Sequence, residues 1–86
     1  MTDVEILTQL GGIFRQIFDE DGIVLTMDTT ASDIKEWDSF NHINLTVAVE
    51  EHFGIKFKTA EIESLRNVGD FVRLIQTKLQ RVANTT

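Results

Sequence analysis

The sequence predicts an all-α fold: one small domain of four helices, with a long loop between the first two. Apolar residues recur at helical spacing in three separate stretches, and a polar capping residue precedes each stretch. The chain has 86 residues and contains neither proline nor cysteine. This length suits a single domain covering residues 1–86, whose core must form without disulfides.

The first helix is expected to begin after Thr2 and to end near Asp19. Thr2 and Glu5 form the Thr-x-x-Glu pattern of a capping box. The glycines at 11–12 lower the helix propensity, and they predict a bend or the close approach of another backbone segment. The apolar stripe of this helix consists of Val4, Leu7, Leu10, Phe14, Ile17 and Phe18, widened by Ile6 and Ile13.

A long connection is expected over residues 23–37, after a turn at Gly22. A loop of this length in a small domain must be attached to the core, and Leu25, Ile34 and Trp37 are the residues expected to attach it. Trp37 is expected to be a partly buried anchor. Residues 32–35 are compatible with a single helical turn.

The second helix is expected to run from Ser39 to about Phe53, with Asp38 as its N-cap. Its apolar residues fall on two opposite faces. Leu45, Val49 and Phe53 form one face, and Phe40, Ile43 and Val47 form the other.

The remaining helices follow an extended link after Gly54. Thr59 is expected to cap a short third helix over residues 60–65, in which Ile62 and Leu65 point inward. Asn67 is expected to cap the fourth helix. The core positions of the fourth helix are Val68, Phe71, Val72, Ile75, Leu79 and Val82.

Ser39 would lie at the positive end of the second helix. Free N–H groups and the helix dipole make such an end favourable for an anion, so a phosphate ester on Ser39 would be stabilised there. The alternative is that Asp38 and Ser39 only cap the helix.

The residues around Ser39 resemble the attachment motif of acyl carrier proteins. The resemblance rests on Asp38-Ser39-Phe40 followed by Ile43, Leu45, Val49, Glu50-Glu51 and Phe53-Gly54-Ile55. In that family an Asp-Ser-Leu triplet opens the second helix of a small four-helix bundle, and the serine carries phosphopantetheine through a phosphodiester. Ser39 matches the modified serine and Asp38 the acid before it. The resemblance assigns Leu45, Val49 and Phe53 to the core. The resemblance extends over about residues 4–82.

What the resemblance implies is a carrier. A phosphopantetheinyl transferase would attach 4'-phosphopantetheine to Ser39. The arm would hold acyl intermediates as thioesters for fatty-acid, polyketide or related biosynthetic enzymes that load and transfer acyl groups. In the family, the positions of Phe40, Ile43 and Val47 form the surface that partner enzymes recognise. The alternative is that the long loop covers this face of the second helix. A groove between the second and third helices is expected to be able to open for an acyl chain.

Three positions depart from the family pattern. Phe40 replaces the usual leucine, and Asn41 and Asn44 stand where acids are common. These changes reduce the charge on the first half of the second helix. They suggest partners that are specialised for this carrier.

The charge distribution bears on partners and location. The net charge is −6, and nine of the fourteen acidic residues lie between Asp19 and Glu51. Such an acidic segment would repel nucleic acid and anionic lipid. Neither a signal peptide nor an apolar stretch of membrane-spanning length is expected. The expectation is a cytoplasmic monomer without membrane insertion.

Catalysis and metal binding are not expected. Asp38, Ser39 and His42 are the residue types of a hydrolytic triad, but one helix places them poorly for it. His42 and His52 are expected to be solvated or to flank the helix, without sharing a metal. Two other functions stay open: an aminoacyl- or peptidyl-type carrier of a specialised pathway, and an unmodified helical interaction module.

Overall fold

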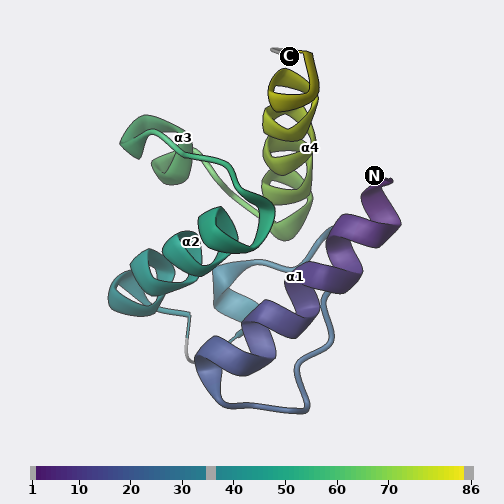
Figure 1. Cartoon of the computed structure of the whole chain (residues 1–86). Coiled ribbons are helices and arrows are strands. Elements are labelled where there is room, and N and C mark those ends of the chain that lie inside the picture. The colour runs from purple at the N-terminus through teal and green to yellow at the C-terminus, as the bar shows by residue number, and fades with distance from the viewer. Residues whose placement is uncertain (1, 35–36, 85–86) are drawn as a thin grey trace.

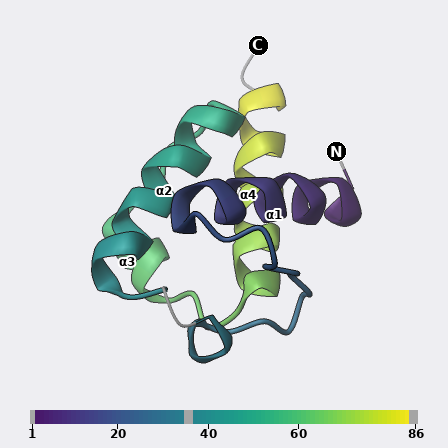
Figure 2. The same ribbon diagram turned by 90° about the horizontal axis from the view of Figure 1, so that it is seen from below.

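The fold consists of helices joined by loops (Figure 1). The computed structural model describes the backbone of residues 2–34 and 37–84, and their side chains except those of Ser39 and residues 81–84. The elements are α1 (Asp3–Phe18), the 3-10 turn η1 (Ala31–Asp33), α2 (Ser39–Phe53), α3 (Thr59–Glu63) and α4 (Val68–Asn84). Helix α1 packs against both α2 and α4, as Figures 1 and 2 show from two directions. The described residues include no strand, and the all-α prediction is confirmed.

Both ends of α1 are fixed by local hydrogen bonds. The capping box is present: the Glu5 N–H donates to Thr2 Oγ1 over 3.2 Å, and the Thr2 N–H donates to Glu5 Oε1 over 2.9 Å. The hydrogen bonds from Thr2 lower the pKa of Glu5. At the other end, Asp19 adopts a left-handed conformation (φ 52°) and its N–H donates to the Arg15 carbonyl. Asp19, and not Gly22, is therefore the left-handed residue that closes the helix.

One further expectation for α1 was wrong, and so was one of the two alternatives for its glycine pair, while the other alternative, a bend, stays a prediction. Val4 is 71% exposed and does not belong to the core. The group nearest to a Cβ on Gly11 would be the Arg15 guanidinium, at 3.3 Å, and not a backbone segment; a Cβ on Gly12 would meet nothing within 4 Å. Arg15 crosses over Gly11 and its Nη1 donates to the Ile23 carbonyl over 3.0 Å. The close approach is thus made by a side chain that ties α1 to the long loop.

The core lies where α1, α2 and α4 meet. Leu45 and Val49 of α2 are fully buried as predicted, whereas Phe53 and Leu79 are only partly buried. The side chain of Val82 lies outside the described residues. The side chains with almost no exposed surface are Ile6, Leu10, Phe14, Leu45, Val49, Val68, Phe71, Val72 and Ile75.

The long loop is attached to the core by side chains and by its backbone. Ile34 is buried and Leu25 and Trp37 pack against the core, as predicted; Ile23, which was not predicted, is buried as well. The predicted helical turn is η1 and ends at Asp33, and Lys35 lies outside the described residues.

Backbone carbonyls of the loop also cap α4. The Val68 N–H donates to the Thr29 carbonyl over 2.8 Å, and the Gly69 N–H donates to the Met27 carbonyl over 2.7 Å. The first N–H groups of a helix have no acceptor within the helix. This part of the loop supplies carbonyl acceptors for two of them. The loop and the start of α4 therefore hold each other in place.

Gly69 allows this contact because it has no side chain. A Cβ at position 69 would lie 2.7 Å from the Met27 carbonyl oxygen, closer than such atoms can approach. We expect Gly69→Ala to lower the free energy of unfolding by about 1–3 kcal/mol, the usual cost of overpacking. Urea unfolding followed by circular dichroism measures the change.

Gly12→Ala is the matched control for Gly69→Ala. Gly12 is exposed inside α1, and a Cβ there would have open space around it. Alanine has the higher helix propensity, so this variant should gain about 0.5–1 kcal/mol. Equal effects of the two substitutions would show that the loop carbonyl does not restrict position 69.

The short helix α3 is joined to α4 by polar side chains. Glu61 Oε1 accepts from the Lys58 N–H and also lies 2.8 Å from Lys78 Nζ on α4. Thr59 is the first residue of α3 and not its cap, because the N-cap position is Lys58. Hydrogen bonding to Lys78, and then to the Lys58 backbone, lowers the pKa of Glu61.

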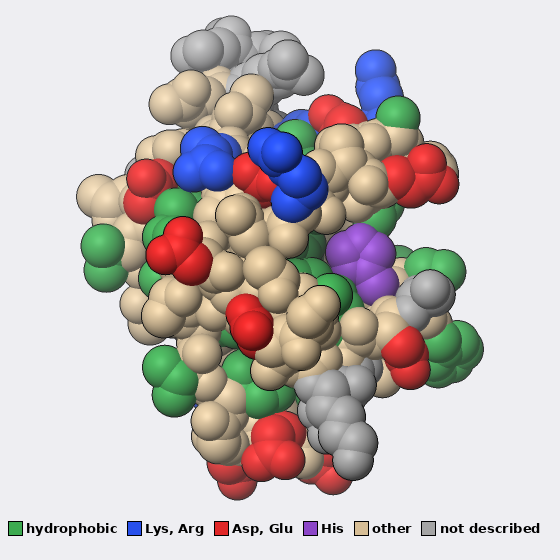
Figure 3. Space-filling model, turned by 180° about the vertical axis from the view of Figure 1, so that it is seen from behind, with side chains coloured by type: hydrophobic (Ala, Val, Ile, Leu, Met, Phe, Trp, Pro, Cys, Tyr) green, Lys and Arg blue, Asp and Glu red, His purple; other side chains and the backbone are tan. Residues whose placement is uncertain are grey.

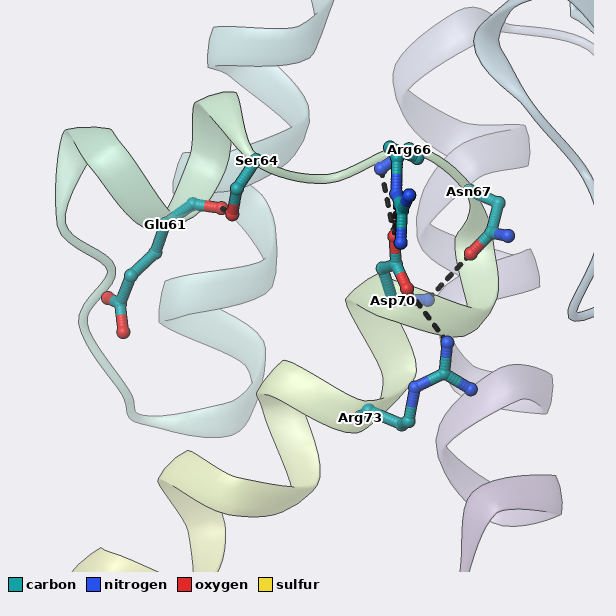
Figure 4. A network of polar contacts seen from close by, with 6 residues as sticks. All are labelled: Glu61, Ser64, Arg66, Asn67, Asp70 and Arg73. Carbon is teal, nitrogen blue, oxygen red and sulfur yellow. Dashed lines mark hydrogen bonds and ion pairs between the residues drawn. The ribbon is translucent and has the colours of Figure 1, made fainter.

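A second polar network surrounds the start of α4 (Figure 4). Asn67 Oδ1 accepts from the Asp70 N–H over 2.8 Å, which confirms the predicted cap. The Asp70 carboxylate contacts Arg73 at 2.7 Å and Arg66 at 3.6 Å. On the face drawn in Figure 3, basic side chains lie next to acidic ones, and further acidic side chains lie apart from them. No helix in the described part of the chain has the length and apolar character needed to cross a membrane.

Candidate functional site

The candidate site begins at the N-terminus of α2. Asp38 is exposed, and its Oδ1 accepts a 2.9 Å hydrogen bond from the Asn41 N–H, which confirms its role as N-cap. Ser39 is the first residue of the helix. The side chain of Ser39 lies outside the described residues, so its exposure stays a prediction. The site thus consists of a capped helix N-terminus, with its favourable field for an anion, at the residue after the cap.

Trp37 connects this N-terminus to the core. Its ring packs edge to face against Phe14 of α1, with 5.0 Å between the ring centroids. On its polar side, Nε1 donates a 2.9 Å hydrogen bond to Nδ1 of His42, one turn into α2. The expectation of a partly buried anchor is confirmed. The end of the long loop is therefore held by α1 on one side and by α2 on the other.

His42 is half-buried, so of the two expected roles, solvated or flanking the helix, the first does not apply to it. Burial lowers the pKa of His42 below the usual value, while a hydrogen bond to the backbone of Ile62 partly opposes this shift. Because Nδ1 accepts from Trp37, the ring proton of the neutral form is on Nε2. His42 thereby joins the end of the loop to α2, and it lines the same cavity as Ile62 of α3.

A cavity of about 420 Å³ lies between the start of α2 and the segment from α3 to α4. It is beside Asp38, and both apolar and polar side chains line it. The lining residues are Ala31, Trp37, Asp38, His42, Ile62, Glu63, Leu65, Arg66 and Asn67. This is the region where the sequence predicted a groove.

The second apolar face of α2 is not covered by the loop. Phe40, Ile43 and Val47 are 73%, 63% and 47% exposed, whereas Leu45 on the opposite face is fully buried. Exposed apolar side chains that are grouped on one face are typical of a surface that contacts another molecule.

The three residue types of a hydrolytic triad do not form one. The Asp38 carboxylate binds the Asn41 N–H, and the His42 Nδ1 is occupied by Trp37. His42 therefore has a structural partner where a catalytic base would need a carboxylate.

The contacts of His42 were the part of the site that sequence reasoning missed. Trp37 and His42 are five residues apart, on either side of a helix start, and no periodic pattern pairs such positions. The one available signal was an indole N–H, which needs a partner when partly buried. Ile62, Glu63 and Arg66 were missed as cavity residues because they reach the site only through the placement of α3.

Comparisons with known proteins agree on one family of relatives. No family model matches the chain. "Acyl carrier protein 2" of Ralstonia nicotianae is 30% identical over 79 residues, which cover 92% of this chain and 98% of that protein. An acyl carrier protein of Rhodococcus erythropolis is 31% identical over 75 residues, 87% of this chain and 82% of that protein. The solution structure of a holo acyl carrier protein from Geobacter metallireducens has 48% identity and a TM-score of 0.88, over 94% of this chain and 93% of that chain.

Proposed function

The chain belongs to the acyl carrier protein family, and we propose that Ser39, the first residue of α2, carries its phosphopantetheine arm. Members of this family carry acyl groups between biosynthetic enzymes, and they are not enzymes themselves. The observation that carries the proposal is the position of Ser39, directly after the capping residue at the N-terminus of a fifteen-residue helix.

The α2 N-terminus fits a phosphodiester at this position. Asp38, and not Ser39, makes the side-chain cap bond, so the helix does not need the Ser39 hydroxyl. The unpaired N–H groups and the dipole of α2 would favour the negative charge of a phosphodiester there. The arm, when attached, supplies a terminal thiol that holds an acyl group as a thioester.

The cavity beside Asp38 supports the proposal that part of the acyl chain binds there. Trp37, Ile62 and Leu65 give it apolar walls that would exclude water from a hydrocarbon segment. The volume of about 420 Å³ lies within the usual range for small-molecule sites. A structure of the acylated protein with the whole chain in solvent would contradict this part of the proposal.

The exposed apolar face of α2 supports the proposal that partner enzymes dock there. Phe40, Ile43 and Val47 follow Ser39 along the helix and remain exposed. The partners would be a phosphopantetheinyl transferase and the enzymes that load and transfer acyl groups. Helix α2 has no acidic residue in its first turn, so we expect apolar contact to contribute more to docking than charge. The carrier would act as a monomer in the cytoplasm.

The test is attachment of the arm to the unmodified protein. The protein is incubated with coenzyme A, magnesium and a broad-specificity phosphopantetheinyl transferase, and its intact mass is measured. We expect a gain of one phosphopantetheine, and trypsin should place this gain on the peptide of residues 36–56, in which Ser39 is the only serine. A folded protein that gains no mass would contradict the proposal and favour an unmodified interaction module.

A further inference from the structure

The cavity beside Asp38 has a basic side chain in its wall. Among the described residues that line it, Arg66 is the only lysine or arginine. Arg66 lies in the link between α3 and α4, so the cavity lies between it and the start of α2. Two acids, Asp38 and Glu63, line the same cavity, and both are exposed. Arg66 is therefore the residue through which this cavity could attract an anion.

The guanidinium of Arg66 is loosely held in its present position. Its Nε lies 3.6 Å from Asp70 Oδ2, which is too long for a hydrogen bond, and the side chain is 88% exposed. The same carboxylate has a closer partner in Arg73, whose Nη2 donates to Oδ1 over 2.7 Å. Figure 4 shows the two arginines on different sides of Asp70. Because exposed ion pairs contribute little to stability, Arg66 can exchange Asp70 for another anion at small cost.

Asp70 would keep its other contacts if the side chain of Arg66 turned away. Its Oδ2 accepts a 3.1 Å hydrogen bond from the backbone N–H of Arg66, and its Oδ1 accepts from Arg73. Neither bond involves the guanidinium of Arg66. The backbone of the link thus stays tied to α4, and the movement of Arg66 is confined to its side chain.

We propose that, in the modified protein, Arg66 binds the phosphodiester that joins the arm to Ser39. The inference rests on the proposed attachment to Ser39 and adds a residue that positions the arm. Asp38, the residue before Ser39, lines the same cavity as Arg66, so an arm on Ser39 begins next to a residue of the cavity wall. The planar fork of an arginine side chain matches the paired oxygens of a phosphate group, and its charge is opposite.

Two positive sources would then act on the phosphodiester. The free N–H groups and the dipole of α2 favour the negative charge from the helix side. Arg66 favours it from the link between α3 and α4. Asp38 and Glu63 would oppose it, but the Asp38 carboxylate is engaged with the Asn41 N–H, and water screens both exposed acids. Without Arg66, the charged residues of the cavity wall would both be acids, so its removal should change the surroundings of the phosphodiester strongly.

The experiment compares the modified wild-type protein with Arg66→Gln and Arg73→Gln. Each substitution removes one positive charge and one contact to Asp70, but only Arg66 lines the cavity. Arg73→Gln is therefore the matched control for changes in net charge and in the contacts of Asp70. All three proteins are incubated with coenzyme A and the transferase, and intact mass verifies that the arm is attached. Phosphorus NMR then reports the surroundings of the phosphodiester.

We expect Arg66→Gln to shift the phosphorus signal from its wild-type position and Arg73→Gln to leave it there. Arg66→Lys should return the signal only part of the way, because lysine keeps the charge but lacks the fork. Added salt should move the wild-type signal towards that of Arg66→Gln, since salt screens exposed charges.

A second readout needs no variant and so does not depend on how a substitution affects folding. In nitrogen–proton NMR spectra of the wild type, the Nε–H signal of Arg66 should shift when the arm is attached, and that of Arg73 should shift less. A signal of Arg66 that is the same before and after attachment would show that this side chain stays with Asp70, and it would overturn the proposal.

Two results with the variants would overturn it as well. One is a phosphorus signal in Arg66→Gln that equals the wild-type signal. The other is an equal shift in Arg66→Gln and Arg73→Gln, which would assign the shift to net charge. In a fully modified protein these results contradict only the role of Arg66, whereas a protein that gains no phosphopantetheine contradicts the proposed function too.

Discussion

Replacing Ser39 by alanine is expected to abolish attachment of phosphopantetheine completely and to leave the fold intact. The substitution removes the hydroxyl that would form the phosphodiester. It does not remove the N-cap bond, which Asp38 Oδ1 makes to the Asn41 N–H. Alanine is also a good helix former, so α2 should keep its length. Intact mass after incubation with coenzyme A and the transferase measures the loss.

Ser32→Ala is the matched control for this experiment. Ser32 is exposed in η1, and the chain has only one further serine, Ser64. The control variant should gain one phosphopantetheine, as the wild type does. A mass gain in Ser39→Ala would assign the attachment to another residue, and a Ser39→Ala variant with a changed circular dichroism spectrum would show that the serine has a structural role.

Phe14→Ala is expected to have the largest effect on stability. Phe14 has no exposed surface, and its ring packs edge to face against Phe18 at 5.5 Å and Trp37 at 5.0 Å. Truncation of such a phenylalanine costs about 3–5 kcal/mol, and native domains are typically stable by only about 5–15 kcal/mol. Urea unfolding should therefore show a large decrease in the free energy of unfolding. If this decrease approaches the total stability of the domain, part of the protein will be unfolded even without urea. Emission from Trp37 should change as well, since its packing partner is removed.

Replacement of Phe40 by alanine should instead leave stability nearly unchanged and weaken binding to partner enzymes. Phe40 is 73% exposed on the proposed docking face, so its removal should change stability by no more than about 0.5 kcal/mol. We expect Phe40→Ala to raise the KM of the transferase or of an acyl-loading enzyme for the carrier, with kcat little changed. An unaltered KM for every partner enzyme would contradict the role of Phe40 in docking. A large loss of stability would mean that the face packs within the protein.

Local patterns in the sequence were sufficient to predict the helices and the start of α2. The Thr2–Glu5 capping box, the Asp38 cap and the left-handed Gly54 after α2 all depend on residues within a few positions of each other. The two apolar faces of α2 also followed from its periodicity, whereas the expectation that Phe40 lies on the exposed face came from the resemblance to acyl carrier proteins. Such features depend on short-range geometry that the residue types largely determine.

Contacts between distant segments could not be predicted in the same way. The Asp19 cap could not be distinguished from one at Gly22, because acids and glycine both follow the last apolar residue of α1. The hydrogen bond from Trp37 to His42 depends on how the long loop returns to the start of α2. These features belong to the tertiary arrangement, which local propensity only weakly constrains.

The hydrogen bonds from α4 to the loop have a consequence for the design of hybrid carriers. Because the Met27 and Thr29 carbonyls bind the N–H groups of Gly69 and Val68, the long loop is not an interchangeable linker. A loop transplanted from another carrier would have to present two carbonyls at the same places, and the recipient would have to keep a glycine where they approach. Segments that are about forty positions apart in the sequence must therefore be exchanged as one part.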